Sequence, residues 1–351
     1  MGFWGVTTTV MGTLSAPSTA SRRPTLRDVA ARAGVSFKTV SRVVNGEPGV
    51  SPDLTARVRA AADALGYRPN AAATALRRAD GRTATLGVLL EDAGNPFFAT
   101  ALRGIEEVAR KRGIAVFASS TDLDAARERD MTRAYVARQV DALITAPTEG
   151  DFAHLADAAR EGTRVVLIDR PATGLDVDVV ITDNRAGSRG AVEHLIAHGH
   201  RRIGFIGRDP SIYTSRERFA GYVEALDAAG IPLDMALVRR EGATRSSAAQ
   251  HVEHLLDQAD PPTALFTGQD LITMTAAGTL QRRGLQDRVA LIGFDDFELA
   301  DLLQPGVTVI AQDPHAIGRL AAERALGNPA STTTSVVPTR LIERGSGEIR
   351  A

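Results

Sequence analysis

The sequence predicts an α/β protein in which a small all-α head precedes a larger body of two doubly wound lobes. Three observations support this division. Residues 25–45 show the pattern of two short helices joined by a tight turn, and from residue 86 onward apolar strand-like runs alternate with amphipathic helices. Residues 21–82 hold 12 basic and 5 acidic side chains, whereas residues 83–351 hold 29 and 37. A basic head on an acidic body indicates that the head alone meets a polyanion.

The first predicted helix starts at Thr25, whose hydroxyl can cap it, with Asp28 at the spacing of a capping box. Gly34 follows this helix where a left-handed residue is needed, and Ser36 can cap the second helix. Apolar residues at helical spacing can form one small core, namely Leu26, Val29, Ala30, Ala33, Val35, Val40, Val43 and Val44. This is the pattern of a helix-turn-helix, although an ordinary helical hairpin shares much of it.

The outer face of the second helix carries polar or stacking side chains. They are Phe37, Lys38, Thr39, Ser41, Arg42 and Asn45. Such side chains suit the base edges and phosphates of a DNA major groove.

A third helix is predicted from Ser51 to Gly66, since Ser-Pro-Asp is a strong helix start. A short Ala-rich helix after Asn70 is too weak to persist alone in water, so it needs DNA or a symmetry mate. These signals divide the chain into a disordered tail at 1–22, a head at 23–69, a hinge helix and linker at 70–84, and a body at 85–346. We expect no secretory signal in the tail because a basic segment is missing, and Met11 is an alternative start.

The alternation of strands and helices in the body predicts parallel sheets, and there are too many strands for one compact sheet. Two similar lobes are therefore expected. The strand-like runs are 86–90, 114–119, 141–147, 164–169, 178–183, 202–207, 237–242, 263–268, 289–295 and 307–312. The helical stretches are 96–113, 124–140, 188–199, 215–230, 246–259, 271–284 and 314–327. Ligands of such sheets bind at the carboxyl ends of the strands, which here carry Asp92, Asn95, Asp169, Gln269 and Asp295.

The chain resembles the LacI/GalR (lactose-repressor) family of bacterial regulators from Thr25 to about Gly345. The most specific segments are TLRDVAARAGVSFKTVSRVVN, the Val50-Ser51 pair and ALGYRPNAAATALR. The body matches through LGVLL…NPFF, VEHLIAHGHRRIGFIG, RERFAGY and LIGFDD. This resemblance implies a DNA-binding repressor that dimerises. It also implies a body like that of periplasmic sugar-binding proteins, which holds a small effector between two lobes.

The resemblance implies a role for individual head and hinge residues. Phe37 and Lys38 should read bases, with Arg42 nearby, and Leu76 should wedge into the minor groove and kink a central base step. Phosphate contacts are implied for Thr39, Ser41 and Asn45. The predicted DNA-contacting set also includes Thr25, Ser36, Asn70 and Ala73.

The resemblance also implies an effector site in the body. Phe97 and Phe98 match aromatic wall positions, Arg218 matches an arginine that grips polar ligand edges, and Asp295 matches a ligand-binding aspartate. Further lining positions are Asp169, Phe266, Gln269 and Gln312. Gln269 departs from the family pattern, because many sugar-binding members have Asn or Asp there. The segment LLQPGVTVIAQD lacks the usual paired prolines, and no leucine heptads follow that would make a tetramer.

No enzyme signature accompanies this pattern. A dinucleotide fingerprint, a phosphate-binding P-loop and a G-x-S-x-G elbow are all missing, so the body is predicted to bind and not to catalyse. Asp295 and Asp296 could form a catalytic pair, but adjacent strand residues point different ways, which favours a hydroxyl acceptor. One of the adjacent Phe97 and Phe98 should be core for the same reason.

Neither a metal nor a cofactor is predicted. The chain has 0 Cys, and His194, His198 and His200 lack supporting acids, which favours packing or surface histidines over a metal site. No apolar run approaches a membrane span of ~18 residues. A cytoplasmic protein is expected.

Three function classes remain open at this point. The leading one is a repressor that binds a near-palindromic double-stranded operator as a homodimer and is controlled by a small ligand, a sugar or a nucleoside. A secreted solute-binding protein is opposed by the basic head, and a sugar-processing enzyme by the missing catalytic residues.

Overall fold

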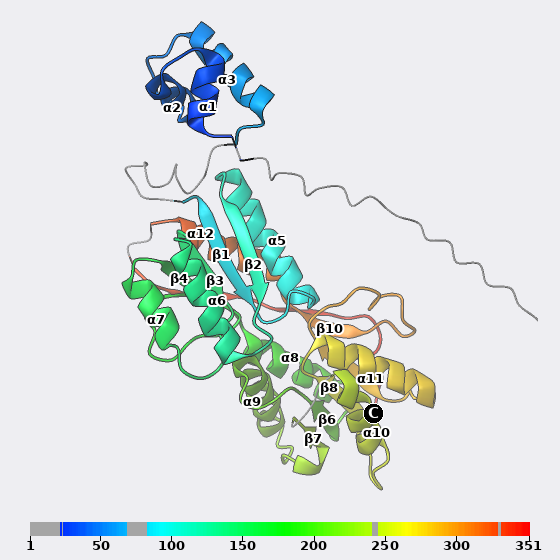
Figure 1. Cartoon of the computed structure of the whole chain (residues 1–351). Helices are drawn as coiled ribbons and strands as arrows, with labels where there is room; N and C mark the ends of the chain where they lie inside the picture. Colours follow the sequence, from blue (N-terminus) through cyan, green and yellow to red (C-terminus); the bar gives the residue numbers. More distant parts are fainter. Residues whose placement is uncertain (1–21, 23, 69–82, 241–244, 329–330) are drawn as a thin grey trace, which may run out of the picture. The chain divides into compact units, whose positions relative to one another are not determined.

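The computed structural model describes residues 22, 24–68, 83–240, 245–328 and 331–351. The chain divides into two compact units, residues 1–81 and 82–351 (Figure 1). The predicted tail up to residue 21 and the hinge residues Asn70, Ala73 and Leu76 lie outside the described residues. No helix within those described ranges is long and apolar enough to cross a membrane.

The first unit is a three-helix head. Its helices are α1 (Leu26–Ala33), α2 (Phe37–Val44) and α3 (Pro52–Leu65). They enclose one small core made of Val29, Ala30, Ala33, Val40, Val58 and Ala61. Four of these six residues come from the helix-turn-helix stretch, so the predicted apolar pattern does build the contact between helices.

The caps of the head helices are the predicted ones. Thr25 and Asp28 form a complete capping box on α1, and Gly34 ends that helix with φ of 62°. Ser36 accepts the backbone N–H of Thr39 at the start of α2. Since a side chain would be strained at this positive φ, Gly34 permits the tight turn that sets α2 against α1.

The second unit contains two six-stranded sheets, one in each lobe. In lobe 1 the strand order is β11-β5-β4-β3-β1-β2, and in lobe 2 it is β12-β10-β9-β8-β6-β7. The strands of lobe 1 are β1 (Thr85–Leu90), β2 (Ala115–Ser120), β3 (Ala142–Thr145), β4 (Arg164–Ile168), β5 (Asp178–Thr182) and β11 (Thr334–Val337). The strands of lobe 2 are β6 (Ile203–Ile206), β7 (Val238–Arg239), β8 (Ala264–Thr267), β9 (Ala290–Phe294), β10 (Thr308–Ala311) and β12 (Arg340–Ile342).

Helices cover the sheets of both lobes, as the alternation predicts. Lobe 1 carries α5 (Pro96–Lys111), α6 (Ala125–Ala137), α7 (Ala153–Arg160) and α12 (Pro314–Leu326). Lobe 2 carries α8 (Asn184–Ala197), α9 (Tyr213–Ala228), α10 (Arg245–Leu256), α11 (Asp270–Arg283) and the short 3-10 helix η1 (Met235–Leu237). Apart from β12, which runs antiparallel to β10, the strand pairs within the sheets are parallel.

The chain passes between the lobes three times, at residues 182–184, 311–314 and 337–340. As a result, α12 from the C-terminal part of the sequence packs on α5 of lobe 1 (Figure 1). This contact is very close, because a Cβ placed on Gly318 would lie 1.9 Å from the carbonyl oxygen of Ala101. Three linking segments make the two lobes a hinged pair with a cleft between the carboxyl ends of their strands.

The sequence did not predict α7, β11 and β12. Helix α7 has only 8 residues, and its N-cap residue, Phe152, has no side chain that can cap it. Strands β11 and β12 are short edge strands with partly exposed side chains. Such segments give weak local signals, and their pairing depends on the chain returning to each lobe.

Candidate functional site

Two of the predicted DNA-contacting side chains of the head, Phe37 and Lys38, are not used by the fold. Phe37 is 48% exposed although it is large and apolar. Lys38 is exposed, and its side chain makes no hydrogen bond or ion pair with any described residue. Both lie in the first turn of α2. An apolar ring and a free ammonium group side by side are available to a polar, negatively charged partner.

The other predicted DNA contacts of the head already have partners within it. Thr25 and Ser36 cap helices, and the Thr39 hydroxyl lies 2.9 Å from that of Ser36. Arg42 donates to the carbonyl of Pro48 and lies 3.7 Å from a carboxylate oxygen of Glu47. The Asn45 amide lies 3.4 Å from both Ser41 Oγ and Glu47 Oε1. These contacts hold the loop after α2 in place. The predicted DNA-contacting residues therefore support the exposed face of α2 as well as lying on it.

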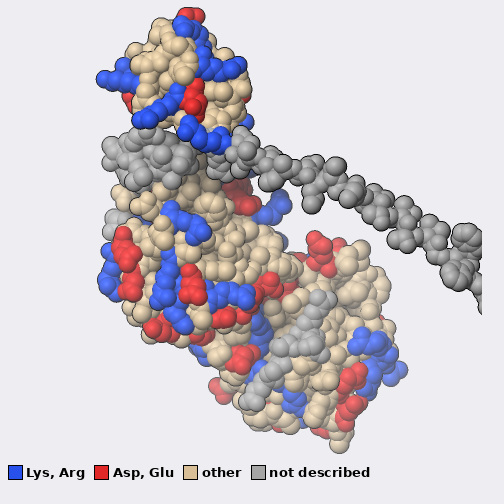
Figure 2. Space-filling view, in the orientation of Figure 1, with Lys and Arg blue, Asp and Glu red and all other residues tan. Residues whose placement is uncertain are grey.

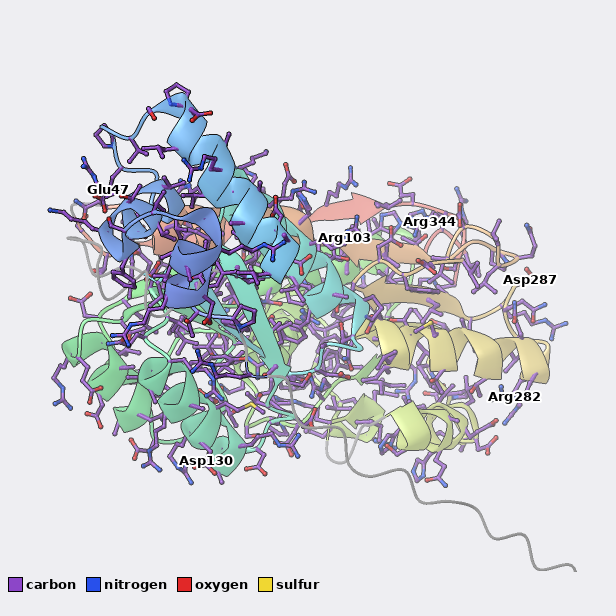
Figure 3. The ribbon with its side chains drawn as sticks, turned by 45° about the horizontal axis from the view of Figure 1, so that its top comes forward. Glu47, Arg103, Asp130, Arg282, Asp287 and Arg344 are labelled. Atoms are coloured by element: carbon purple, nitrogen blue, oxygen red, sulfur yellow. The ribbon has the colours of Figure 1, made fainter. Side chains whose placement is uncertain are left out.

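The charge of the head also favours a negatively charged partner. On the side shown in Figure 2, Lys and Arg side chains on the head outnumber the acidic ones, whereas both signs mix on the body. In Figure 3, Glu47 marks the loop that follows α2. The excess of basic residues therefore lies in the unit that carries α2.

A pocket lies between the two lobes of the body, with a free volume of about 420 Å³ that includes open solvent. Seven of the eight predicted effector residues line it, namely Phe97, Phe98, Asp169, Arg218, Gln269, Asp295 and Gln312. They come from the segments that follow β1, β4, β8, β9 and β10, and from α9. The carboxyl ends of the strands in both lobes thus face one another across this pocket.

Phe266 is a correction to the sequence analysis, since it does not line the pocket. Its side chain is fully buried in lobe 2, and its ring centroid lies 5.7 Å from that of Phe205. Strand β8 is buried on both faces, so its apolar run gave no sign of which face Phe266 occupies. Asp92 is also outside the pocket, where it accepts the backbone N–H of Gly94 and closes a turn.

The two adjacent phenylalanines take different roles, as expected. Phe98 is 4% exposed and belongs to the core of lobe 1, whereas Phe97 packs partly exposed against that core. Their rings meet edge to face with centroids 5.0 Å apart. Phe97 therefore offers a supported apolar surface to a bound molecule.

Arg218 is the centre of the polar network in lobe 2. Its Nε donates to Asn184 at 2.8 Å, and its Nη1 donates to the carbonyl of Gly268 at 2.7 Å and to Asp295 at 3.2 Å. The guanidinium carbon lies 3.8 Å from the ring centroid of Phe294. With only 5% of its surface exposed, the side chain is held in one orientation before any ligand arrives.

Asp295 connects this network to the hinge. Gln312 donates its amide to Asp295, and the Thr182 hydroxyl donates to the Gln312 side-chain oxygen. Thr182 and Gln312 both lie at segments that cross between the lobes. A ligand that competes for Asp295 therefore acts next to the linking segments.

Asp169 and Asp295 occupy equivalent positions in the two lobes, after β4 and β9. Both have positive φ, 69° and 74°, which is unusual for residues other than glycine. Each backbone N–H donates to the neighbouring strand, from Asp169 to Val180 and from Asp295 to Ile310. Strained backbone at matching positions on opposite sides of a pocket marks these aspartates as functional candidates.

Lobe 1 contributes a second charged network that the sequence analysis missed. Arg170 donates to Asp169 at 3.0 Å and to Glu91, and Arg208 of lobe 2 lies 2.8 Å from Glu91. Glu91, Arg170 and Arg208, which were not singled out from the sequence, all line the pocket. Each follows a strand at its carboxyl end, so the rule that singled out Asp169 also applies to Glu91, Arg170 and Arg208.

Burial and pairing together set the protonation of this network. Burial raises the pKa of Asp169, against the opposing effect of Arg170. Burial by itself would raise the pKa of Glu91. The nearby Arg170 and Arg208 have a larger opposite effect and hold the pKa of Glu91 below its ordinary value. Burial by itself would lower the pKa of Arg170. The nearby Asp169 and Glu91 have a larger opposite effect, so the pKa of Arg170 is raised.

Asp270 lies beside this site, at the start of α11. Burial first and the Asp295 carboxylate second raise the pKa of Asp270 to about 6. Asp296, next in sequence to Asp295, points elsewhere and forms a two-point ion pair with Arg344 at 2.7 and 2.8 Å. The adjacent pair therefore does not work as two catalytic carboxylates.

The histidines singled out in the sequence have packing partners. His200 is fully buried and bonds Thr263 and the carbonyl of Ile349, both at 2.8 Å. His194 Nε2 lies 2.8 Å from Glu348. Among the described residues, no group of three or more His, Cys, Asp or Glu side chains could hold a metal ion.

Comparison with known proteins covers both units. Residues 25–70 match the model of bacterial regulatory proteins of the lacI family, and residues 83–344 match that of periplasmic binding proteins and the sugar binding domain of the LacI family. The catabolite control protein A of Priestia megaterium is 32% identical over 300 residues, which are 85% of this chain and 90% of that protein.

Solved structures agree. The Lac repressor dimer bound to operator and the anti-inducer ONPF has a TM-score of 0.81 at 25% identity, over 93% of this chain and 99% of that one. The complex of the transcriptional regulator CelR with cellobiose has a TM-score of 0.68 at 31% identity, over 92% and 100%. Since the family models match both units, the chain belongs to the LacI family of bacterial transcriptional regulators, and it is not an enzyme.

Proposed function

We propose that this protein is an operator-binding repressor whose DNA affinity is controlled by a neutral polyhydroxylated ligand, in the first place a sugar, bound between the lobes. The observation that carries the proposal is the gathering of Phe97, Asp169, Arg218, Asp295 and Gln312 around one pocket. These groups offer an apolar surface, fixed donors and charged acceptors. A sugar presents apolar ring faces and hydroxyls that both donate and accept.

The charges of the pocket favour a neutral ligand. Its lining contains the cations Arg170, Arg208 and Arg218 and the carboxylates Glu91, Asp169 and Asp295, so the two signs balance. An ionic ligand would have to break existing ion pairs, whereas hydroxyls can bond to groups that stay paired. Within the described residues, Nη1 of Arg170 is buried without a hydrogen-bond partner, which leaves a donor for a ligand oxygen. The solved CelR structure contains cellobiose, which is a neutral sugar.

DNA binding is assigned to the face of α2 that carries Phe37 and Lys38, with Arg42 and the polar residues around it at the phosphates. Asn70, Ala73 and Leu76 complete the proposed contact at a minor groove. A homodimer on a near-palindromic operator is supported by the Lac repressor dimer on its operator. Large apolar side chains exposed on the body, such as Phe117 at 45% and Leu302 at 69%, suit an interface between two subunits.

We propose a cytoplasmic location, because the proposed partner is operator DNA. The proposed domain limits keep the hinge at 70–84 and the effector-binding body at 85–346. Closure of the lobes around a ligand would change the relative position of the two heads in a dimer. Ligand binding would in this way change the affinity of the heads for DNA.

Two linked experiments test this function. Selection of binding sites from random double-stranded DNA should enrich an inverted repeat, and the selected site should then be titrated with D-ribose, D-glucose, cellobiose and glucose 6-phosphate. A neutral sugar that changes operator affinity supports the proposal. A response to the phosphorylated sugar alone would refute the charge argument, and failure to enrich any DNA would refute the assignment of the head.

A further inference from the structure

Helix α9, which carries Arg218, starts without a cap of its own. Its N-cap residue is Ile212, whose side chain cannot accept a hydrogen bond. The first backbone N–H groups of a helix have no partner inside the helix and need one outside it. Tyr213 N–H donates to Glu149 Oε1 at 3.0 Å. Glu149 lies in the loop between β3 and α7, so a carboxylate of lobe 1 caps a helix of lobe 2.

Charge strengthens this contact. The positive end of a helix dipole favours an anion at its N-terminus. Arg216 Nη2 lies 3.6 Å from the same Glu149 oxygen, and the Arg216 guanidinium also donates to the carbonyls of Pro210 and Ser211. The Glu149 carboxylate thus meets a backbone N–H, a helix N-terminus and a guanidinium, all from lobe 2.

A buried glutamate anchors the loop that carries Glu149. Glu128 is fully buried on α6, accepts the Thr148 N–H at 2.5 Å and lies 3.1 Å from His154 Nε2 on α7. The residue before Glu149 is therefore anchored to the interior of lobe 1. The backbone next to Glu149 therefore moves with lobe 1, so a movement of lobe 1 relative to α9 acts on this contact.

Glu149 acts on the pocket through α9 and not by touching it. Thr214, Ser215 and Arg218 of α9 line the pocket, whereas Glu149 does not. A second charged contact between the lobes, Glu91 with Arg208, lies within the pocket and is open to competition from a ligand. A ligand in the pocket would not compete directly for Glu149, because this residue does not line the pocket.

We infer that Glu149 is a positioning residue that latches lobe 1 to the N-terminus of α9 and so holds the lobes closed around the pocket. Opening the cleft separates the carboxylate from the Tyr213 N–H, whereas closing it restores the cap. Loss of a helix cap corresponds to a change of on the order of fivefold in the closed-to-open ratio. Under the proposed function, the apparent affinity for the effector would fall by at most about the same factor, because only the closed fraction binds tightly.

Energy transfer between the lobes tests the latch without any effector, so its failure and that of the proposed function are separate results. The chain has 0 Cys, and dyes can therefore be attached at Asp130→Cys in lobe 1 and Asp287→Cys in lobe 2. Figure 3 labels both side chains, on α6 and before β9. Labelled chains are diluted into an excess of unlabelled protein, so that a dimer with a labelled subunit holds only one.

Four changes are compared in this labelled background. Glu149→Ala should produce a second population with altered transfer efficiency. Glu149→Gln should stay closer to the parent, because its amide oxygen still accepts the Tyr213 N–H. Arg216→Ala, which keeps the cap, should have a smaller effect than Glu149→Ala. Glu161→Ala removes an exposed acid at the end of α7 and should match the parent.

A Glu149→Ala distribution identical to the parent would overturn the latch. An equal shift for Glu149→Ala and Glu149→Gln would overturn the helix cap as its basis, since charge alone would then be responsible. Hydrogen exchange of the 213–216 amides provides a second readout, in which Glu149→Ala should exchange roughly fivefold faster. Unchanged exchange there would contradict the cap. If Glu149→Ala does not fold, Arg216→Ala is compared with the parent instead: a small shift of the transfer distribution supports the contact with Glu149, and an unchanged distribution contradicts it.

Discussion

Asp270 should lower the stability of the folded protein at neutral pH, and Asp270→Asn should relieve this. The carboxyl is 1% exposed, and burial and the Asp295 carboxylate raise its pKa from 3.8 to about 6. A raised carboxyl pKa means that the folded state binds more protons than the unfolded state between these two values. The free energy of unfolding that Asp270 contributes therefore falls as pH rises from about 4 to about 6.

The size of this effect follows from the pKa rise. A rise from 3.8 to about 6 corresponds to at most about 3 kcal/mol of stability lost above pH 6. Asn keeps the oxygen that accepts the Leu271 N–H at 2.7 Å, so the substitution removes the charge without removing this bond. We expect Asp270→Asn to raise the free energy of unfolding by about 1–3 kcal/mol at pH 7.

Urea unfolding from pH 4 to pH 8 measures both the size and the pH dependence. The gain should be largest above pH 6 and should shrink toward pH 4, where Asp270 of the parent becomes neutral. Glu161→Asn, at the exposed end of α7, removes a carboxylate without this burial and is the control. A variant that is no more stable than the parent at pH 7, or a gain that does not change with pH, would refute the reasoning.

Three further substitutions test the other parts of the account. Lys38→Ala should change the preference among operator variants by about 1–3 kcal/mol per contacted base pair, measured by competition binding, while Thr39→Ala should weaken all sites alike. Leu76→Ala should reduce operator affinity far more than affinity for random DNA, since a wedge acts only where DNA can be kinked; equal losses in parallel titrations would indicate simple packing. Gly318→Ala should destabilise the body by several kcal/mol in urea unfolding, because its Cβ would meet the Ala101 carbonyl oxygen 1.9 Å away and helix backbone cannot yield cheaply. A Gly318→Ala protein of parental stability would show that α5 and α12 can separate freely.

The head could be predicted almost completely because its signals are local. The Thr25 capping box, Gly34 and the Ser36 cap depend on residues within a few positions of one another. The parallel strands were equally clear, because strands buried on both faces are continuous apolar runs. Helix α7 and strands β11 and β12 were missed, since short segments are determined by the surfaces on which they pack.

The pocket was predictable in part. Asp295 and Arg218 lie far apart in the sequence. Only the resemblance to the LacI/GalR family predicted that they belong to one site, since their spacing gave no sign of it. Phe266 was placed wrongly because a fully buried strand does not reveal which face each side chain occupies. The contact of Arg208 with Glu91 and that of Glu149 with α9 join different lobes, so only the folded chain shows them.

The central claim is that a ligand in the pocket controls DNA binding through Arg218 and Asp295. The most direct test is an operator titration of the parent, Asp295→Ala and Arg218→Ala, each with and without the identified effector, paired with calorimetry of effector binding. Because each substitution leaves one partner of a buried ion pair alone, Asp295→Asn is included as the mildest change, and circular dichroism confirms folding. We expect the variants to bind operator without effector as the parent does and to lose the response to the effector. If the variants respond at the concentrations that act on the parent, the effector does not bind in this pocket.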